Sequence, residues 1–179
     1  MSGQAGDALR VSVIGSSGSG KTTFGRAISA RLGVPYVELD SIFHQPGWTE
    51  LPDDEFQARV RDATAGDGWV VDGNYGVVRP IVLERATTVV WLDYSRPRVM
   101  QQVIRRSVTR GLLHRELWNG NREDPRMWTR ASHPIRWAWT HHARKRAEYE
   151  ARYREPQYAH LDLQRFRVPR EAQRWLESL

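Results

Sequence analysis

The chain has 179 residues, the size of a single domain that can bury a hydrophobic core, and its lack of cysteine excludes disulfides, thiol nucleophiles and cysteine-ligated metal centres. The formal net charge of +6 is uneven, because acidic side chains are in excess over residues 1–95 and basic ones over residues 96–179. No segment approaches the ~18 apolar residues of a membrane span and the N-terminus has no leader pattern, so we expect a cytoplasmic protein with no membrane contact.

Short apolar runs alternate with helical patterns along the chain. Residues 9–15 have the pattern of a buried strand that ends in a Gly/Ser loop, and apolar positions at helical spacing follow up to a stop signal at Gly33 and Pro35. Further strands are expected at 35–40, 68–72, 87–93 and 160–163, and helices are expected to open at Pro52, Val77, Ser95 and Pro169. This alternation predicts an α/β fold with a parallel sheet covered on both faces and a ligand site at the carboxyl ends of the strands.

The second half of the chain contains a less regular region. Residues 111–126 are rich in Arg, Asn, Gly and acidic residues with little periodicity, and we interpret them as a lid-like excursion within a single domain spanning residues 1–179. Residues 127–154 are mostly helical in composition.

The most informative segment fits the pattern G-x-x-x-x-G-K-T between a predicted strand and a predicted helix, as that motif requires. Its glycines let the backbone wrap closely around phosphates, and successive N–H groups at a helix N-terminus face their negative charge. Lys21 is expected to reach the β- and γ-phosphates, and the Thr22 hydroxyl is expected to ligate Mg²⁺. The sequence therefore predicts a site for ATP or GTP with Mg²⁺, formed by Gly15, Ser16, Ser17, Gly18, Ser19, Gly20, Lys21, Thr22 and Thr23.

Three further motifs accompany this loop: Leu39-Asp40-Ser-Ile-Phe with Pro46-Gly-Trp48, Trp69-Val-Val-Asp-Gly-Asn-Tyr75, and Glu84-Arg85 leading into Val90-Trp-Leu-Asp93. With them the chain resembles, over nearly its whole length, the P-loop kinases of the nucleoside-monophosphate and shikimate kinase type. Within that group it is most similar to the bacterial topology-modulation proteins. The resemblance implies a three-layer α/β/α P-loop NTPase fold, a five-stranded parallel sheet in the order 2-3-1-4-5, a helical lid over the phosphates, and ATP as donor.

Two acidic residues at predicted strand ends are candidates for the chemistry. In the implied strand order Asp72 lies beside the strand that feeds the P-loop, so its carboxylate is a candidate Mg²⁺ ligand; the alternative is an aspartate that only ends a strand in an Asp-Gly turn. In kinases of the shikimate type an acid at the position of Asp40 binds the acceptor hydroxyl or assists its deprotonation, and the alternative is a helix-capping or turn role. His44 is a weaker candidate, and Asp93 is interpreted as structural.

Arginines supply the remaining candidates. Phosphoryl transfer needs positive charge on the equatorial oxygens, and Arg106 and Arg110 beside the lid are expected to provide it; the alternative is a solvated helix face. Arg165 and Arg167, expected in the loop between the last strand and the last helix, look like the adenine-contacting loop of these kinases. An ordinary surface turn explains them equally well.

These observations predict an ATP:Mg²⁺-dependent phosphotransferase that moves the γ-phosphoryl group to a nucleotide or another small hydroxyl-bearing acceptor. Two alternatives remain open at this point. One is an ATP-binding, nucleic-acid-associated regulator of DNA topology, which the name of the topology-modulation group suggests and the basic second half permits. The other is a P-loop protein that binds nucleotide only to gate a partner protein. The sequence indicates neither the acceptor nor the oligomeric state.

Overall fold

The structure is a computed structural model that describes residues 9–112, 118–121 and 134–179, with the side chains of residues 107–112 and 134–138 outside the description. Within these ranges no helix is long and apolar enough to cross a membrane. Of the lid-like excursion, only the end of the helix at residues 111–112 and residues 118–121 are described. The lid expectation for the other residues of 111–126 therefore lies outside the described residues.

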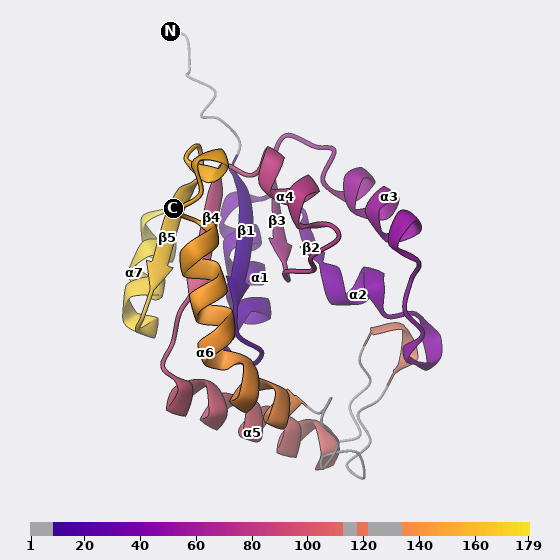
Figure 1. Cartoon of the computed structure of the whole chain (residues 1–179), viewed down its shortest axis with the longest axis vertical. Helices are drawn as coiled ribbons and strands as arrows, with labels where there is room; N and C mark the ends of the chain where they lie inside the picture. The colour runs from indigo at the N-terminus through magenta and orange to yellow at the C-terminus, as the bar shows by residue number, and fades with distance from the viewer. Residues whose placement is uncertain (1–8, 113–117, 122–133) are drawn as a thin grey trace, which may run out of the picture.

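A parallel sheet forms the centre of the molecule (Figure 1). Its strands lie in the spatial order β2-β3-β1-β4-β5, which confirms the expected order and the α/β fold class. All four neighbouring pairs are parallel, and the central strands are almost wholly buried because helices cover both faces. The strands are β1 (Arg10–Gly15), β2 (Tyr36–Glu38), β3 (Trp69–Asp72), β4 (Thr88–Leu92) and β5 (Asp162–Phe166).

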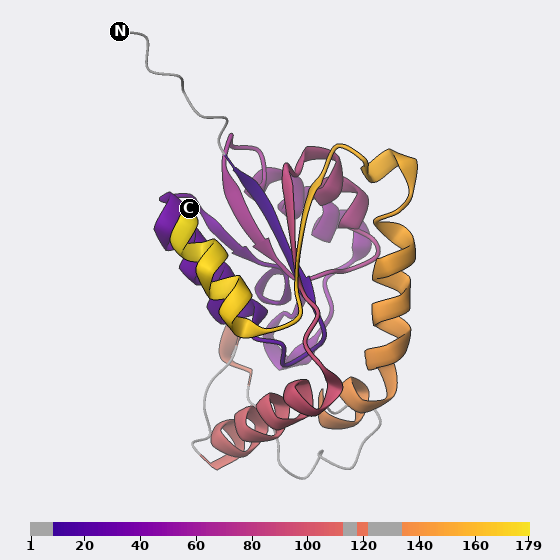
Figure 2. The same cartoon turned by 90° about the vertical axis from the view of Figure 1, so that its left-hand side faces the viewer.

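Two helical layers pack against this sheet and bury its apolar side chains. One layer holds α1 (Lys21–Leu32) and α7 (Pro169–Ser178), which lie side by side in Figure 2. The opposite layer holds α3 (Asp53–Ala63), α4 (Arg79–Arg85) and α6 (Pro134–Arg152). Successive residues of β1 face opposite layers, as the two-residue period of a strand requires. The expected three-layer architecture is therefore confirmed.

The remaining elements gather at the carboxyl ends of the strands. The long helix α5 (Arg96–Leu112) crosses beneath these ends and meets the first part of α6 (Figures 1 and 2). The short elements α2 (Leu39–Phe43), η1 (Pro46–Trp48) and η2 (Trp118–Gly120) lie beside one another. A 3-10 turn, η4 (Pro156–Tyr158), precedes β5. This end of the sheet is where the sequence places its functional residues.

Two strand boundaries differ from expectation. The second strand ends at Glu38, and Asp40 lies in the first turn of α2 rather than at the strand end. The chain turns into the helix at this point because the Ser41 hydroxyl donates to the Glu38 carbonyl (2.7 Å). The last strand begins at Asp162 and runs to Phe166, so Arg165 lies in a strand and not in a loop. β5 is an edge strand and tolerates polar side chains, so alternation is a poor guide to its limits.

Candidate active site

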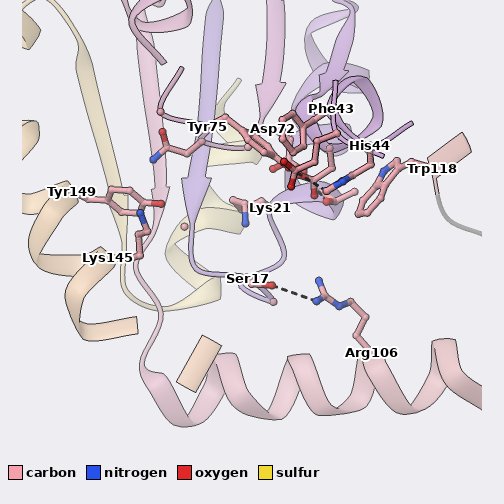
Figure 3. Close-up of a pocket in the computed structure, with 18 residues that line it drawn as sticks. Ser17, Lys21, Phe43, His44, Asp72, Tyr75, Arg106, Trp118, Lys145 and Tyr149 are labelled. Carbon is pink, nitrogen blue, oxygen red and sulfur yellow. Dashed lines mark hydrogen bonds between the residues drawn. The ribbon is translucent and has the colours of Figure 1, made fainter. Parts of the chain in front are cut away.

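A pocket of about 680 Å³ opens at the carboxyl ends of the strands (Figure 3). The P-loop forms its floor, α2 and the loop after β3 form one wall, and α5 and α6 contribute from the other sides. Its lining comprises Gly15, Ser17, Gly18, Lys21, Thr22, Asp40, Phe43, His44, Glu50, Asp72, Gly73, Asn74, Tyr75, Gly76, Arg106, Trp118, Lys145 and Tyr149. The fold thus brings the P-loop, Asp40, Asp72 and Arg106 together around one space.

The P-loop has the tight backbone that its glycines predict. Gly18 (φ +81°) and Gly20 (φ +91°) occupy the left-handed region, which favours glycine. A Cβ at Gly18 would lie 2.0 Å from Cγ2 of Val103, so the loop is wedged against α5. The Ser19 N–H donates to the Ser16 carbonyl (3.0 Å). The loop is therefore a compact backbone cradle at the N-terminus of α1, suited to an anion.

Cationic side chains reach the same space from separate elements. Lys21 Nζ donates to the Ser16 carbonyl (3.2 Å), and Arg106 on α5 donates from Nη2 to Ser17 Oγ (3.4 Å) (Figure 3). Arg110 lies in the same helix, but its side chain lies outside the described residues. The charge around the P-loop therefore suits a polyphosphate, and an arginine anchored to the loop can act on the oxygens of a bound phosphoryl group.

Lys145 is a pocket residue that the sequence pattern did not reveal. It projects from α6 into the lining beside Tyr149 and pairs with Glu148 (2.9 Å). Its place in a basic tract of α6 is typical of a solvated helix face, and only the packing of α6 over β1 and β4 brings it to the pocket. No local signal would have found it.

Asp72 is nearly buried, with 4% of its surface exposed. Its Oδ2 accepts hydrogen bonds from the Thr22 hydroxyl (2.7 Å) and the Tyr36 hydroxyl (3.0 Å), whereas its Oδ1 is buried and has no hydrogen-bond partner among the described residues. Burial, followed by the charge of Asp72, raises the pKa of Tyr36, which keeps that phenol a donor. The sequence prediction that Asp72 lies beside the P-loop is confirmed.

The side-chain oxygens of Asp72 and Thr22 are suitable ligands for the Mg²⁺ ion that would accompany ATP. A hard cation prefers carboxylate and hydroxyl oxygens, and the buried Asp72 Oδ1 beside the Thr22 hydroxyl offers them. No group of three or more His, Cys, Asp or Glu residues that could hold a metal occurs in the described part of the chain. Such an ion would complete its coordination with water and phosphate oxygens, as is usual for Mg²⁺.

Asp40 lies on the wall formed by α2 and the loop after β3, in the first turn of α2. The Tyr75 hydroxyl donates to its Oδ1 (2.5 Å), and the same hydroxyl lies 3.5 Å from Nε2 of His44. The Tyr75 ring packs against Phe43 (centroids 4.7 Å apart) and Phe56 (5.4 Å). Sequence reasoning selected Asp40 and His44 but not Tyr75, whose position depends on the course of the loop after β3.

The short segment at residues 118–121 docks against α2 and η1. The Trp118 ring stacks on His44 (centroids 5.9 Å apart, 27° between planes), and Asn119 Nδ2 donates to the His44 carbonyl (2.6 Å). Asn121 is buried, accepts from the Trp48 N–H (2.9 Å) and donates to the Gln45 carbonyl (3.0 Å). Trp118 lines the pocket, a role that the sequence analysis did not assign to it.

The arginines expected to contact adenine lie outside this pocket's lining. Arg165 donates from Nε (2.9 Å) and Nη2 (2.7 Å) to Oδ2 of the buried Asp93 and lies over the Trp91 ring (4.1 Å to the centroid). Asp93 also pairs with Arg146 (3.2 Å), and these ion pairs support its structural interpretation. The Arg167 N–H donates to Glu171 (3.2 Å) at the start of α7. The adenine contact of Arg165 and Arg167 stays a prediction.

Comparison with known proteins identifies relatives that are kinases. No family model matches the chain. A shikimate kinase from Symbiobacterium thermophilum is 30% identical over 127 residues, which cover 63% of this chain and 71% of that protein. A cytidylate kinase from Nitratidesulfovibrio vulgaris is 35% identical over 68 residues, which cover 37% of this chain and 29% of that protein.

A solved structure gives the same result for the fold. The crystal structure of a shikimate kinase from Bacteroides thetaiotaomicron superposes with a TM-score of 0.56 at 15% identity. The superposition covers 95% of this chain and 97% of that one. At this identity the match shows a shared fold and leaves the acceptor open.

Proposed function

The chain belongs to the shikimate kinase family of P-loop kinases, and on that premise we propose that it transfers the γ-phosphoryl group of ATP, in the presence of Mg²⁺, to a hydroxyl group of a small acceptor. The observation that carries this proposal is the pocket whose floor is the P-loop and whose wall carries Asp40. A donor site and a carboxylate facing it across one space are what in-line transfer between two bound molecules needs.

On the donor side the chain's own residues bind and orient the triphosphate. The P-loop amides and Lys21 hold the phosphates, and Thr22 and Asp72 would hold Mg²⁺, which supplies charge neutralisation when bound. Arg106, anchored at Ser17, is placed to stabilise charge on the transferred group. We further expect Arg110, Arg165 and Arg167 to contact the donor.

On the acceptor side Asp40 binds the hydroxyl and takes its proton as the acceptor oxygen bonds to the γ-phosphorus and the bond from that phosphorus to the departing ADP breaks. The wall around it is aromatic, with Phe43, His44, Tyr75 and Trp118 in the lining. The related kinases named above act on different acceptors, shikimate and cytidylate, so the family leaves the acceptor of this chain unidentified. The aromatic wall indicates that part of the acceptor is flat or apolar.

The decisive experiment is ATP consumption with Mg²⁺ across a panel that includes shikimate, nucleoside monophosphates, nucleosides and sugar acids. Wild type is compared with Lys21→Ala, and Arg59→Ala serves as a control because Arg59 is exposed on α3 and its ion pair within the described residues is with Glu55 on the same helix. Acceptor-dependent turnover that is lost in Lys21→Ala and kept in Arg59→Ala supports the proposal. Turnover that survives Lys21→Ala would overturn it.

The resemblance to the topology-modulation proteins suggests a second candidate, an ATP-binding regulator that acts on nucleic acid. The relatives described above are kinases of small molecules, and no contact in the described residues favours the regulator, so we do not adopt it. Duplex DNA titration tests the choice, because neutralising several phosphates makes affinity fall steeply with salt. Tight binding with such a slope, and no acceptor-dependent turnover, would reverse our choice.

A cytoplasmic location stays a prediction.

A further inference from the structure

One hydrogen bond in the pocket is not explained by the roles assigned so far. The Tyr75 hydroxyl donates to Oδ1 of Asp40 at 2.5 Å, while Oδ2 has no hydrogen-bond partner among the described residues and Asp40 lines the pocket. We propose that Tyr75 is a positioning residue, which holds one oxygen of Asp40 so that the other is presented to the acceptor hydroxyl. This inference rests on the proposed function and adds a specific role for a residue of the loop after β3.

The backbone fixes this tyrosine relative to α2. Gly73, with φ +122°, starts the loop after β3, and a Cβ there would lie 3.0 Å from the Leu39 Cβ. The loop therefore presses against the first residue of α2, immediately before Asp40. Its tight approach sets the distance between the two elements, and the Tyr75 ring is held further by Phe43 and Phe56. These contacts hold the Tyr75 hydroxyl in a fixed position relative to α2.

The raised pKa of Tyr75 determines that its phenol is the donor in the hydrogen bond with Asp40. Burial first, and then the negative charge of Asp40, raises the pKa of Tyr75, with Glu50 and Asp72 adding to the effect. The phenol therefore stays protonated and donates to the carboxylate. His44 Nε2 lies farther from the hydroxyl, at 3.5 Å, and the cations Lys21, Arg106 and Lys145 reach the pocket from other walls. Among the described residues, Tyr75 makes the hydrogen bond to the Asp40 carboxylate.

A held carboxylate should matter for the transfer step more than for donor binding. Without the phenol, Asp40 can rotate, and the fraction of time in which its free oxygen meets the acceptor hydroxyl falls. We expect Tyr75→Phe to lower kcat roughly tenfold, the size of one lost hydrogen bond to a charged group. The KM for ATP should stay unchanged, because the P-loop is untouched.

A double-mutant cycle tests whether Tyr75 acts through Asp40. Wild type, Tyr75→Phe, Asp40→Asn and the double variant are compared with the best acceptor of the panel. We expect Tyr75→Phe to have no further effect in the Asp40→Asn background. Tyr153→Phe is the matched control, since the Tyr153 hydroxyl is buried without a hydrogen-bond partner in the described part of the chain. Equal losses in both backgrounds, or an equal loss in Tyr153→Phe, would overturn the proposal.

A second readout does not depend on activity. Proteins carrying ¹³C-labelled tyrosine are titrated to alkaline pH by NMR, with Tyr75→Phe identifying the signal. In wild type Tyr75 should remain protonated where an ordinary phenol, with a pKa of about 10, ionises, and in Asp40→Asn its pKa should fall. An identical titration in both proteins would overturn the contact. If the titrations differ as expected but no acceptor consumes ATP, the proposed kinase function fails and the positioning role of Tyr75 in transfer fails with it.

Discussion

The two sides of the pocket are built by different means. The donor side comes from one continuous segment, the P-loop, whose glycines and backbone N–H groups form the cradle. Gly18 in this segment packs closely against Val103 of α5. The acceptor side comes from side chains of α2, the loop after β3 and η2, held together by aromatic contacts and by Asn119 and Asn121. A triphosphate is the same in every kinase, so a backbone cradle suffices, whereas a particular acceptor needs side chains that can differ.

Both sides nevertheless hold a carboxylate with a tyrosine. Tyr36 donates to Asp72 on the donor side, and Tyr75 donates to Asp40 on the acceptor side. The difference is in burial, because Asp72 is 4% exposed and receives Thr22 as well, whereas Asp40 is only partly buried. A buried carboxylate with two donors is suited to a fixed cation, and a more open one is suited to an exchangeable ligand.

The largest expected effect comes from breaking the donor side. Lys21→Ala removes the cation that we propose faces the phosphates, and transfer should fall by at least a factor of about 1,000, or roughly 4 kcal/mol in transition-state stabilisation. Circular dichroism and urea unfolding should match wild type, because within the described part of the chain the Lys21 ammonium makes a single hydrogen bond, to the Ser16 carbonyl. A variant that unfolds instead would remove the basis for assigning Lys21 to the donor.

Asp40→Asn breaks the acceptor side alone. Loss of the proposed general base should lower acceptor-dependent kcat by about 100-fold, within the usual range for such groups, while the dissociation constant for ATP stays unchanged. Steady-state kinetics and calorimetry measure the two quantities. An equal loss of ATP affinity would show that the two sides are not separable.

Gly18→Ala probes the wedge between the P-loop and α5. Its Cβ would meet Val103 at 2.0 Å and the backbone has φ +81°, so we expect a loss of roughly 2–4 kcal/mol in the free energy of unfolding. Gly33→Ala is the control, because φ there is +66° but no atom lies within 4 Å of the added Cβ, and about 1 kcal/mol is expected. Denaturant unfolding that gives equal losses would mean that the contact with Val103 contributes nothing.

The smallest effect concerns the two tyrosines. Burial raises the pKa of Tyr36 and of Tyr75 above the ordinary value of 10.0. Their contribution to stability is therefore fully present below about pH 10 and is lost as the pH rises further, because the unfolded chain ionises first. Tyr36→Phe should make the alkaline decline of stability shallower. Urea midpoints at neutral and alkaline pH measure this, and an unchanged slope would contradict the burial of Tyr36 as the cause.

The donor side could be predicted from sequence because its signal is local. Eight consecutive residues between a strand and a helix identify the phosphate loop, and the implied strand order correctly places Asp72 beside it. The acceptor side could be predicted only in part. Asp40 lies in a sequence motif that can be recognised. Tyr75, Trp118 and Lys145 reach the pocket because segments distant in the sequence pack together, and the spacing of apolar residues does not reveal such packing. Arg165 was misplaced because edge strands tolerate polar residues.

The wedge of Val103 against Gly18 also bears on the entropy of activation. Val103 is fully buried and lies one helical turn before Arg106, so the contact fixes the root of the arginine that reaches Ser17. An arginine on a flexible loop would lose conformational entropy during the reaction. Arg106 has lost much of that entropy already when the chain folds. In its proposed role Arg106 should therefore act mainly by lowering the activation enthalpy. Replacing Val103 by alanine should make the activation entropy less favourable while Arg106 itself is intact.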